Sequence, residues 1–323
     1  MRILITGATG FVGGHLVELL QAEGGHEIVG LSRKDPRPVS RAHLGGMTRL
    51  VYAELSDGPN LETTLRETKP EWIFHLAGFA HPGDSFLNPE GCWSDNLNAT
   101  QCLYDSVLRT GFSPRILFVS TGLVYGDPTG SGEPFTETSP LRPASPYAES
   151  KKAADLLGEK MARESGIDVV RVRPFNQIGP RQSADYAVAN FARHVAAIER
   201  GSQPPVITPK GDLSAFRDLT DVRDMVRAYR LLIESGKRGE VYNAGSGTAY
   251  RIGDILNRLI QLSGMPIDVK QTAEPSRKAS AGVARADTTK LRAATGWEPR
   301  YPFDETLKDV LTYWRAVSAP AAS

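Results

Sequence analysis

Short apolar runs alternate with longer amphipathic stretches over the first half of this 323-residue chain. Runs rich in Ile, Val and Leu and bounded by turn residues are typical of buried strands. Such runs occur at residues 2–6, 27–32, 48–55, 71–77, 115–121 and 168–174. The spacing of apolar residues between them predicts helices over 13–22, 60–68, 89–110 and 146–165. This alternation is typical of a parallel, doubly wound sheet.

The alternation breaks after Pro174. Helices are predicted over 187–200, 221–234, 252–263 and 304–314, with short strands at 240–244 and 267–271. Residues 127–145 and 201–219 lack a regular pattern, and 318–323 are predicted to be a frayed end. We therefore predict an α/β protein with a larger domain over 1–175, which carries the catalytic residues. A smaller C-terminal α/β lobe over 176–323 would hold the substrate and return segments to the larger domain.

A glycine-rich turn joins the first predicted strand to the first helix. Gly7 allows a tight turn, Gly10 lets the backbone approach a pyrophosphate, and Gly13 lets the helix pack closely on the sheet. The helix N-terminus then offers free amides and a positive dipole end to the phosphates. Other α/β proteins also contain glycine-rich turns, but the flanking strands favour a Rossmann domain that binds a dinucleotide. Contacts are expected at Gly7, Thr9, Gly10, Phe11 and Val12.

The end of the second strand indicates which dinucleotide binds. Sequences selective for a ribose 2′-hydroxyl usually carry Asp or Glu there, whereas this chain has Ser32, Arg33 and Lys34. An arginine binds phosphate through two parallel hydrogen bonds. A solvated basic loop is the alternative interpretation. We predict that the chain prefers NADP(H), with NAD(H) as the second choice.

A tyrosine and a lysine share one face of the helix predicted to begin at Pro146. Ser145 suits the N-cap, and the four-residue spacing places Tyr147 and Lys151 on the same side. A phenol has a reference pKa of about 10, and a nearby cation lowers that pKa. Tyr147 can then exchange a proton with an alcohol or ketone oxygen. Most such pairs lie on exposed helix surfaces, so this interpretation depends on the other motifs.

Composition argues against several classes of function. The net charge of +1 gives no bias toward nucleic acid or anionic membranes. No apolar run approaches the roughly 18 residues of a membrane-spanning helix. Two cysteines, Cys92 and Cys102, indicate a reducing compartment rather than a disulfide framework, and no Cys/His cluster suggests a metal site. Without a signal-peptide pattern, a cytoplasmic protein is expected.

Several short motifs follow one another in order along nearly the whole chain. Besides the glycine turn, they are His75-Leu76-Ala77-Gly78, Asn96, Ser120-Thr121-x-x-x-Tyr125-Gly126, Pro146-Tyr147-x-x-x-Lys151, Arg173-Pro174-Phe175-Asn176 and Arg217-Asp218. Together they resemble the extended short-chain dehydrogenase/reductase superfamily, in its nucleotide-sugar branch. Members of that family often dimerise through the two helices expected here at 89–110 and 146–165, so the resemblance implies a homodimer.

The resemblance also implies roles for individual residues. Thr121 would hydrogen-bond the reacting oxygen, Tyr147 would be the general acid/base, and Lys151 would bind the nicotinamide ribose and lower the pKa of Tyr147. Further cofactor contacts are expected at Ser32, Arg33, Glu54, Leu55, Leu76, Ala77, Gly78, Asn96, Ser120, Tyr147, Lys151, Pro174 and Phe175. Substrate contacts are expected at Thr121, Asn176, Arg217 and Arg277.

Leu123 bears on the type of reaction. Sugar-nucleotide 4,6-dehydratases carry an acid at the corresponding position, and a leucine cannot transfer a proton. Residues 173–180 and 214–222 are most similar to GDP-4-keto-6-deoxy-mannose reductases, although those reductases often carry an acid where Leu123 stands. We predict NADPH-dependent reduction of GDP-4-keto-6-deoxy-D-mannose to GDP-D-rhamnose, with an NAD-dependent 4-epimerase as the main alternative. A dehydratase and a non-catalytic cofactor-binding protein are less favoured.

Overall fold

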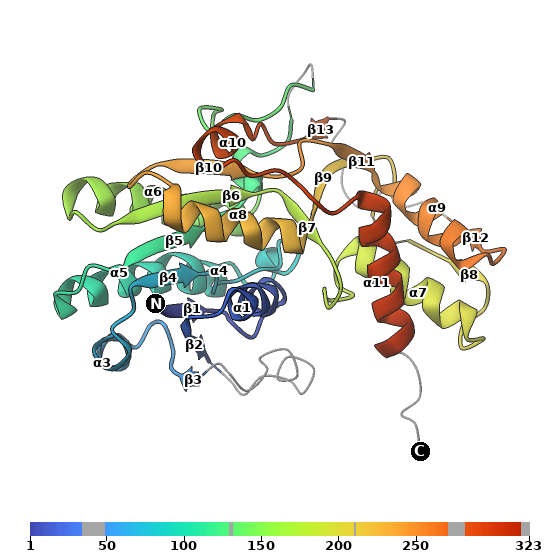
Figure 1. The fold of residues 1–323 in the computed structure, drawn as a ribbon. Coiled ribbons are helices and arrows are strands. Elements are labelled where there is room, and N and C mark those ends of the chain that lie inside the picture. Colours follow the sequence, from blue (N-terminus) through green and yellow to red (C-terminus); the bar gives the residue numbers. More distant parts are fainter. Residues whose placement is uncertain (34–48, 129–131, 210, 271–281, 318–323) are drawn as a thin grey trace.

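The computed structural model describes residues 1–33, 49–128, 132–209, 211–270 and 282–317 (Figure 1). A seven-stranded sheet forms the centre of the larger lobe, in the order β10-β6-β5-β4-β1-β2-β3, and every neighbouring pair is parallel. Its strands are β1 (Arg2–Thr6), β2 (Glu27–Ser32), β3 (Arg49–Tyr52), β4 (Trp72–His75), β5 (Arg115–Val119), β6 (Val169–Pro174) and β10 (Val241–Ala244). The predicted α/β class with a parallel, doubly wound sheet is confirmed.

Helices cover both faces of this sheet. One face carries α1 (Phe11–Glu23), α8 (Val222–Ser235) and α10 (Thr289–Thr295), and the other carries α3 (Gly58–Thr68), α5 (Ala99–Thr110) and α6 (Pro146–Glu164). Successive strand residues face opposite sides. Ile3 and Ile5 therefore pack in the core under α1 and α8, while Leu4 packs under α3 and α5. Burial on both faces explains why these strands appear in the sequence as continuous apolar runs.

Several predicted elements of the larger lobe are shorter or interrupted. The helix predicted over 89–110 consists of α4 (Pro89–Trp93), one π-helical turn (Ser94–Asn98) and α5. The strand predicted over 115–121 ends at Val119, because Thr121 caps a short 3₁₀ helix, Gly122–Tyr125, by accepting a hydrogen bond from the Leu123 amide at 3.2 Å.

The smaller lobe contains α7 (Ala187–Glu199), α9 (Ile252–Ser263) and α11 (Phe303–Val317), which share one apolar core. Its main sheet is built around β9 (Phe216–Asp221), which pairs with β7 (Asn176–Ile178), β11 (Ala249–Arg251) and β13 (Val283–Ala284). The prediction of irregular structure over 201–219 is wrong for the first part of β9. Two further short strands, β8 (Val206–Ile207) and β12 (Asp268–Val269), pair with each other, so the strand predicted at 267–271 is shorter in its described part. The predicted frayed end, 318–323, lies outside the described residues.

Three of the described elements that follow residue 175 lie in the larger lobe: β10, α8 and α10. Strand β10 pairs with β6 at the edge of the seven-stranded sheet, and α8 packs against α1. In the sequence, the last strand of the larger sheet therefore comes after β7, α7 and β9 of the smaller lobe. The division of the chain at residue 175 stays a prediction.

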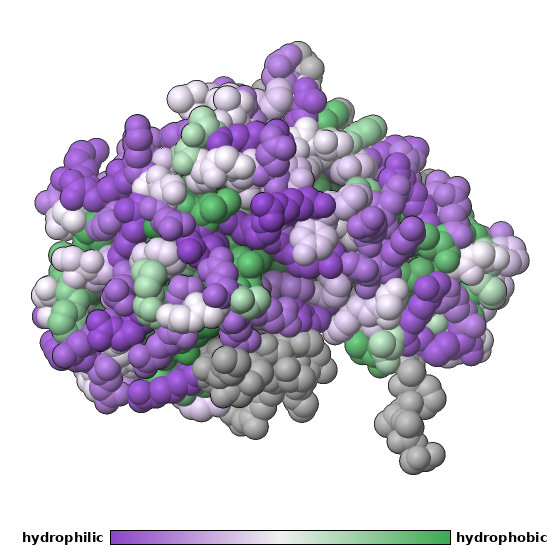
Figure 2. All heavy atoms as spheres, viewed as in Figure 1, coloured by the Kyte–Doolittle hydropathy of each residue, from purple (hydrophilic) through white to green (hydrophobic). Residues whose placement is uncertain are grey.

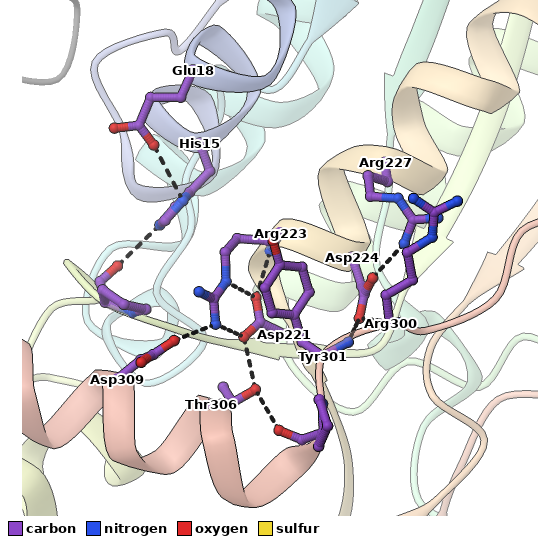
Figure 3. Close-up of polar contacts among 12 residues, drawn as sticks. His15, Glu18, Asp221, Arg223, Asp224, Arg227, Arg300, Tyr301, Thr306 and Asp309 are labelled. Atoms are coloured by element: carbon purple, nitrogen blue, oxygen red, sulfur yellow. Dashed lines mark hydrogen bonds and ion pairs between the residues drawn. The ribbon is translucent and has the colours of Figure 1, made fainter. Parts of the chain in front are cut away.

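A network of carboxylates anchors α11 to the corner between β9 and α8 (Figure 3). Asp221 accepts hydrogen bonds from Thr306 at 2.7 Å and Arg223 at 2.6 Å, and Arg223 also pairs with Asp309 at 2.8 Å. One residue further along α8 is Asp224, whose Oδ2 accepts from the backbone amides of Arg300 and Tyr301. The two aspartates are buried and their hydrogen bonds are charge-assisted. These bonds therefore hold α11 and the segment before it firmly against the N-terminal end of α8.

The face drawn in Figure 2 is mostly hydrophilic, with hydrophobic residues in small separate areas. In the part of the chain that the structure describes, no helix has the length and apolar character needed to cross a lipid bilayer.

Candidate active site

The glycine turn after β1 is shaped for a close ligand. Gly7 has a φ of 74°, and a Cβ atom on it would lie 2.9 Å from the Ala77 amide nitrogen. A Cβ atom on Gly13 would lie 2.2 Å from the Gly7 carbonyl oxygen, so α1 can approach β1 only because residue 13 is glycine. Gly10 is the N-cap of α1 and gives no side-chain cap. The amides of the first helical turn therefore remain available to an anion such as a pyrophosphate.

A cavity of about 780 Å³ opens at the carboxyl ends of the strands and extends to the smaller lobe. Most residues predicted for the site line it. For the cofactor they are Gly7, Thr9, Gly10, Phe11, Val12, Ser32, Arg33, Glu54, Leu55, Leu76, Ala77, Gly78, Ser120, Tyr147, Lys151, Pro174 and Phe175. For the substrate they are Thr121, Asn176 and Arg217, whereas Arg277 lies outside the described residues. The structure brings these residues together, and their individual roles stay predictions.

Asn96 is the predicted cofactor residue that does not line the cavity. Its side chain is buried behind Gly78, where a Cβ atom would lie 2.4 Å from Asn96 Oδ1. The Asn96 amide donates to Ser150 Oγ at 2.9 Å, and among the described residues nothing donates to its Oδ1. Asn96 thus supports the cavity wall and the start of α6 from behind.

The start of α6 places Tyr147 and Lys151 side by side in the cavity wall. The Ser145 hydroxyl accepts from the Ala148 amide at 3.2 Å, and Pro146 occupies the first helical turn. This cap fixes where the helix begins, and hence which face carries Tyr147 and Lys151. Lys151 Nζ donates to the Val119 carbonyl oxygen at 3.0 Å, which holds the ammonium at the end of β5.

Burial controls the acidity of this pair. The pKa of the Tyr147 hydroxyl is raised by desolvation, and the hydrogen bond between Tyr147 and Thr121 only partly opposes that rise. Burial also lowers the pKa of Lys151, to about 8. The sequence predicted a lowered pKa for Tyr147, and this is wrong for the structure described here because desolvation of the phenolate outweighs the favourable contacts. Tyr147 is therefore a protonated phenol at neutral pH, suited to donate a proton.

Arg33 already has a partner inside the cavity. Its Nη1 lies 3.1 Å from Asp95 Oδ1, with the two side chains 52% and 29% exposed. Next to it, the hydroxyls of Ser32 and Thr9 are 3.3 Å apart. A 2′-phosphate at the end of β2 would therefore have to attract Arg33 away from Asp95 or share it.

The smaller lobe supplies polar groups to the opposite side of the cavity. Asn176 on β7 donates to the Asp218 carbonyl oxygen at 3.3 Å, and Arg217 on β9 donates to the Phe216 carbonyl oxygen at 2.8 Å. The Asp218 carboxylate is fully buried and accepts from the amides of Ser246, Gly247 and Ala286. These bonds fix the register of β9, so that Arg217, its neighbour on the strand, faces the cavity.

Sequence reasoning missed several residues in the cavity wall. Six of them belong to irregular segments, for which apolar periodicity gives no signal: Phe79, Ala80, Phe135, Gln182, Ser183 and Tyr186. The other two, Asp95 in the π-helical turn and Gln177 in β7, are polar residues whose orientation toward the cavity depends on the tertiary fold. His75, by contrast, is a structural residue: both ring nitrogens are hydrogen-bonded, to Thr6 at 2.8 Å and to Thr100 at 3.0 Å. Burial lowers the pKa of His75 to about 3, so it stays neutral.

Comparison with known proteins agrees with this geometry. Residues 4–310 match the family described as GDP-mannose 4,6 dehydratase. GDP-6-deoxy-D-mannose reductase of Pseudomonas aeruginosa is 30% identical over 98% of this chain and 97% of its own. UDP-glucose 4-epimerase of Mycolicibacterium smegmatis is 29% identical over 98% of this chain and 99% of its own.

Solved structures share the whole fold. RMD from Pseudomonas aeruginosa, complexed with NADPH, superposes with a TM-score of 0.86 at 29% identity, covering 98% of this chain and 100% of that one. UDP-glucose 4-epimerase of Thermus thermophilus, in complex with NAD, gives 0.86 at 28% identity, covering 98% and 99%. The chain therefore belongs to the extended short-chain dehydrogenase/reductase superfamily, among its NAD(P)-dependent nucleotide-sugar epimerases and dehydratases.

Proposed function

We propose that the protein reduces the 4-keto group of a nucleotide-linked 4-keto-6-deoxy sugar with NADPH, converting GDP-4-keto-6-deoxy-D-mannose to GDP-D-rhamnose. The observation that carries the proposal is Leu123, which lines the cavity two residues after Thr121 and is 38% exposed. Elimination of water from a hexose needs an acid or base beside C5 and C6. A leucine at that position supports hydride transfer as the complete reaction.

The chain's own groups support this chemistry. When bound, NADPH supplies the hydride that reduces the C4 carbonyl carbon. Thr121 holds the carbonyl oxygen by a hydrogen bond, and Tyr147 donates its phenolic proton to that oxygen, so the ketone becomes an alcohol. Lys151, as a cation, stabilises the phenolate left on Tyr147. A phenol whose pKa is raised by burial keeps its proton until the carbonyl oxygen gains negative charge.

The relatives support the nucleotide assignment only by analogy. The reductase from Pseudomonas aeruginosa is named for a GDP-linked 6-deoxy sugar, and the RMD structure contains NADPH. The UDP-glucose 4-epimerase of Thermus thermophilus has the same TM-score of 0.86, and its structure contains NAD. The Arg33–Asp95 pair favours this second candidate, because the cation expected to bind a 2′-phosphate is already paired with a carboxylate in the cavity wall.

One experiment separates the candidates. The purified protein is incubated with GDP-4-keto-6-deoxy-D-mannose and NADPH, and absorbance at the wavelength of the reduced nicotinamide is followed with product identification by NMR. We expect stoichiometric NADPH oxidation and GDP-D-rhamnose, and a loss of about a hundredfold or more in turnover for Tyr147→Phe with NADPH binding unchanged. Tightly bound NAD, with interconversion of UDP-glucose and UDP-galactose and no net oxidation, would identify an epimerase instead. Cofactor binding without turnover of any nucleotide sugar in a wider panel would identify a non-catalytic protein.

A further inference from the structure

Tyr186 connects the two lobes beside the cavity. It immediately precedes α7 in the smaller lobe, and its hydroxyl donates to the carbonyl oxygen of Ala80, in the loop after β4, at 2.9 Å. Its ring also contacts the imidazole of His81, with ring centroids 5.0 Å apart. The neighbouring Asp185 carboxylate lies 4.0 Å from His81 Nε2. These contacts hold together segments that are about a hundred residues apart in the chain, and Tyr186 and Ala80 both line the cavity.

The Tyr186 hydroxyl oxygen can still accept hydrogen bonds. Its proton is committed to Ala80, and among the described residues no group donates to its oxygen. A phenolic oxygen can both donate and accept. A ligand in the cavity with an O–H group would therefore find a fixed acceptor here, at little entropic cost, because the ring is held by Ala80 and His81.

Tyr186 also lies near the centre where the chemistry is expected. It is close enough to Tyr147 to contribute to the raised pKa of that phenol. Tyr147 marks the position of the reacting carbonyl oxygen in the proposed function. The glycine turn, which suits the pyrophosphate of the cofactor, belongs to β1 and α1 in the larger lobe, whereas Tyr186 comes from the smaller lobe together with Asn176 and Arg217. The acceptor therefore faces the substrate side of the reacting centre.

We propose that Tyr186 is a sugar-specificity residue, which accepts a hydrogen bond from a hexose hydroxyl group close to the reacting carbon. This inference rests on the proposed function in requiring that a nucleotide-linked hexose occupies the cavity. It assigns to Tyr186 a contact with the sugar and none with the nucleotide. Sugars that lack the hydroxyl group would leave the Tyr186 oxygen without a donor and bind more weakly.

The test compares ligands with and without a sugar. Isothermal titration calorimetry measures the Kd of GDP, GDP-mannose and the GDP-mannose analogues that lack a single hydroxyl at C2, C3 or C4. The proteins are the wild type, Tyr186→Phe and the matched control Tyr313→Phe, which removes a hydroxyl from a ring on α11 that contacts Trp314 and does not line the cavity. UDP with UDP-glucose and dTDP with dTDP-glucose serve as further pairs if GDP-mannose binds no tighter than GDP.

We expect Tyr186→Phe to weaken GDP-mannose binding about tenfold, the size of one hydrogen bond, and to leave GDP and NADPH within twofold. One deoxy analogue should bind the wild type about tenfold more weakly than GDP-mannose does, and its Kd should be the same for Tyr186→Phe as for the wild type. Tyr313→Phe should leave all of these dissociation constants unchanged.

Three results would overturn the proposal. The first is an equal loss of affinity for GDP and GDP-mannose in Tyr186→Phe, as a purely structural contact between the lobes would give. The second is no loss of affinity for any ligand in that variant. The third is that, in the wild type, no nucleotide sugar binds more tightly than its nucleotide alone. A sugar-specific loss in a protein that oxidises no NADPH would keep the role of Tyr186 and reject the reductase assignment.

Discussion

Arg33 offers a quantitative test of cofactor choice, because it must choose between two anions. Its pair with Asp95 is 3.1 Å long but largely exposed, and exposed pairs contribute about 0.2–1 kcal/mol. A hydrogen bond to a charged group contributes about 1.5–3 kcal/mol. Transfer of Arg33 from Asp95 to a 2′-phosphate should therefore yield a net gain of about 1–2 kcal/mol, or roughly 5- to 30-fold in Kd.

Two substitutions separate the contribution of the Arg33–phosphate contact from that of the Arg33–Asp95 pair. Arg33→Ala should weaken NADPH binding by roughly 5- to 30-fold and leave NADH nearly unchanged, because NADH has no 2′-phosphate. Asp95→Asn should strengthen NADPH binding by about twofold to fivefold, since it removes the competing partner and a like charge near the phosphate. Arg49→Ala is a matched control: Arg49 is also an exposed arginine, paired with Glu67 at 3.3 Å, but does not line the cavity.

The assay is the quenching of protein fluorescence by NADPH and by NADH, titrated at low and moderate salt. The phosphate contact predicts that the NADPH advantage of the wild type shrinks as salt is raised, since exposed charges are screened. Equal losses for both cofactors in Arg33→Ala, or no gain in Asp95→Asn, would refute the reasoning. Arg33 would then be a surface residue whose partner is Asp95 alone.

Three further predictions concern stability and assembly. Asp155→Ala should lower the free energy of unfolding in urea by about 3–5 kcal/mol, because Asp155 is fully buried and bonds Arg171 and Arg173 at 2.7 Å each; a loss below about 1 kcal/mol would contradict this. Burial lowers the pKa of His15 to about 4, so between pH 6.5 and 4 the unfolded chain binds a proton there that the folded chain does not; the contribution of His15 to stability should fall by about 3 kcal/mol over this range, in addition to the fall caused by His75, and His15→Gln should reduce the total fall by that amount. Trp93→Glu, on an exposed apolar position of α4, should convert the predicted homodimer to a monomer in light scattering with an unchanged Tm; a dimeric variant would place the interface elsewhere.

The larger lobe could be predicted from the sequence because its signals are local. Strand β1 is apolar at consecutive positions, since both of its faces are buried. The turn that follows it needs glycine at residue 7 for its positive φ, and α1 needs glycine at residue 13 because the Gly7 carbonyl oxygen lies so close. Ser145 likewise marks the start of α6 through a bond to its own helix. Each of these patterns reports a contact made within a few residues or an environment shared by a whole strand.

The pKa of Tyr147 could not be predicted in the same way. Helical spacing indicates that Tyr147 and Lys151 share a face, and the structure places both in the cavity wall. The pKa of Tyr147 depends on how deeply its phenol is buried, on the hydrogen bond to Thr121 and on the nearby Tyr186, all of which are set by the tertiary fold. The sequence thus identifies the pair, whereas the tertiary structure determines the direction of the shift.

Strand β9 shows why the smaller lobe was harder to predict than the larger one. Arg217, Asp218 and Thr220 interrupt its apolar pattern, so the sequence appears irregular there. Asp218 is nevertheless fully buried, because three backbone amides from other loops compensate its charge, and Arg217 is polar because it faces the cavity. A strand that lines a binding site must carry polar groups toward the ligand and support them with polar groups behind. In this protein, the polar residues that conceal β9 from pattern analysis therefore include Arg217, which lines the cavity and which we predict to contact the substrate.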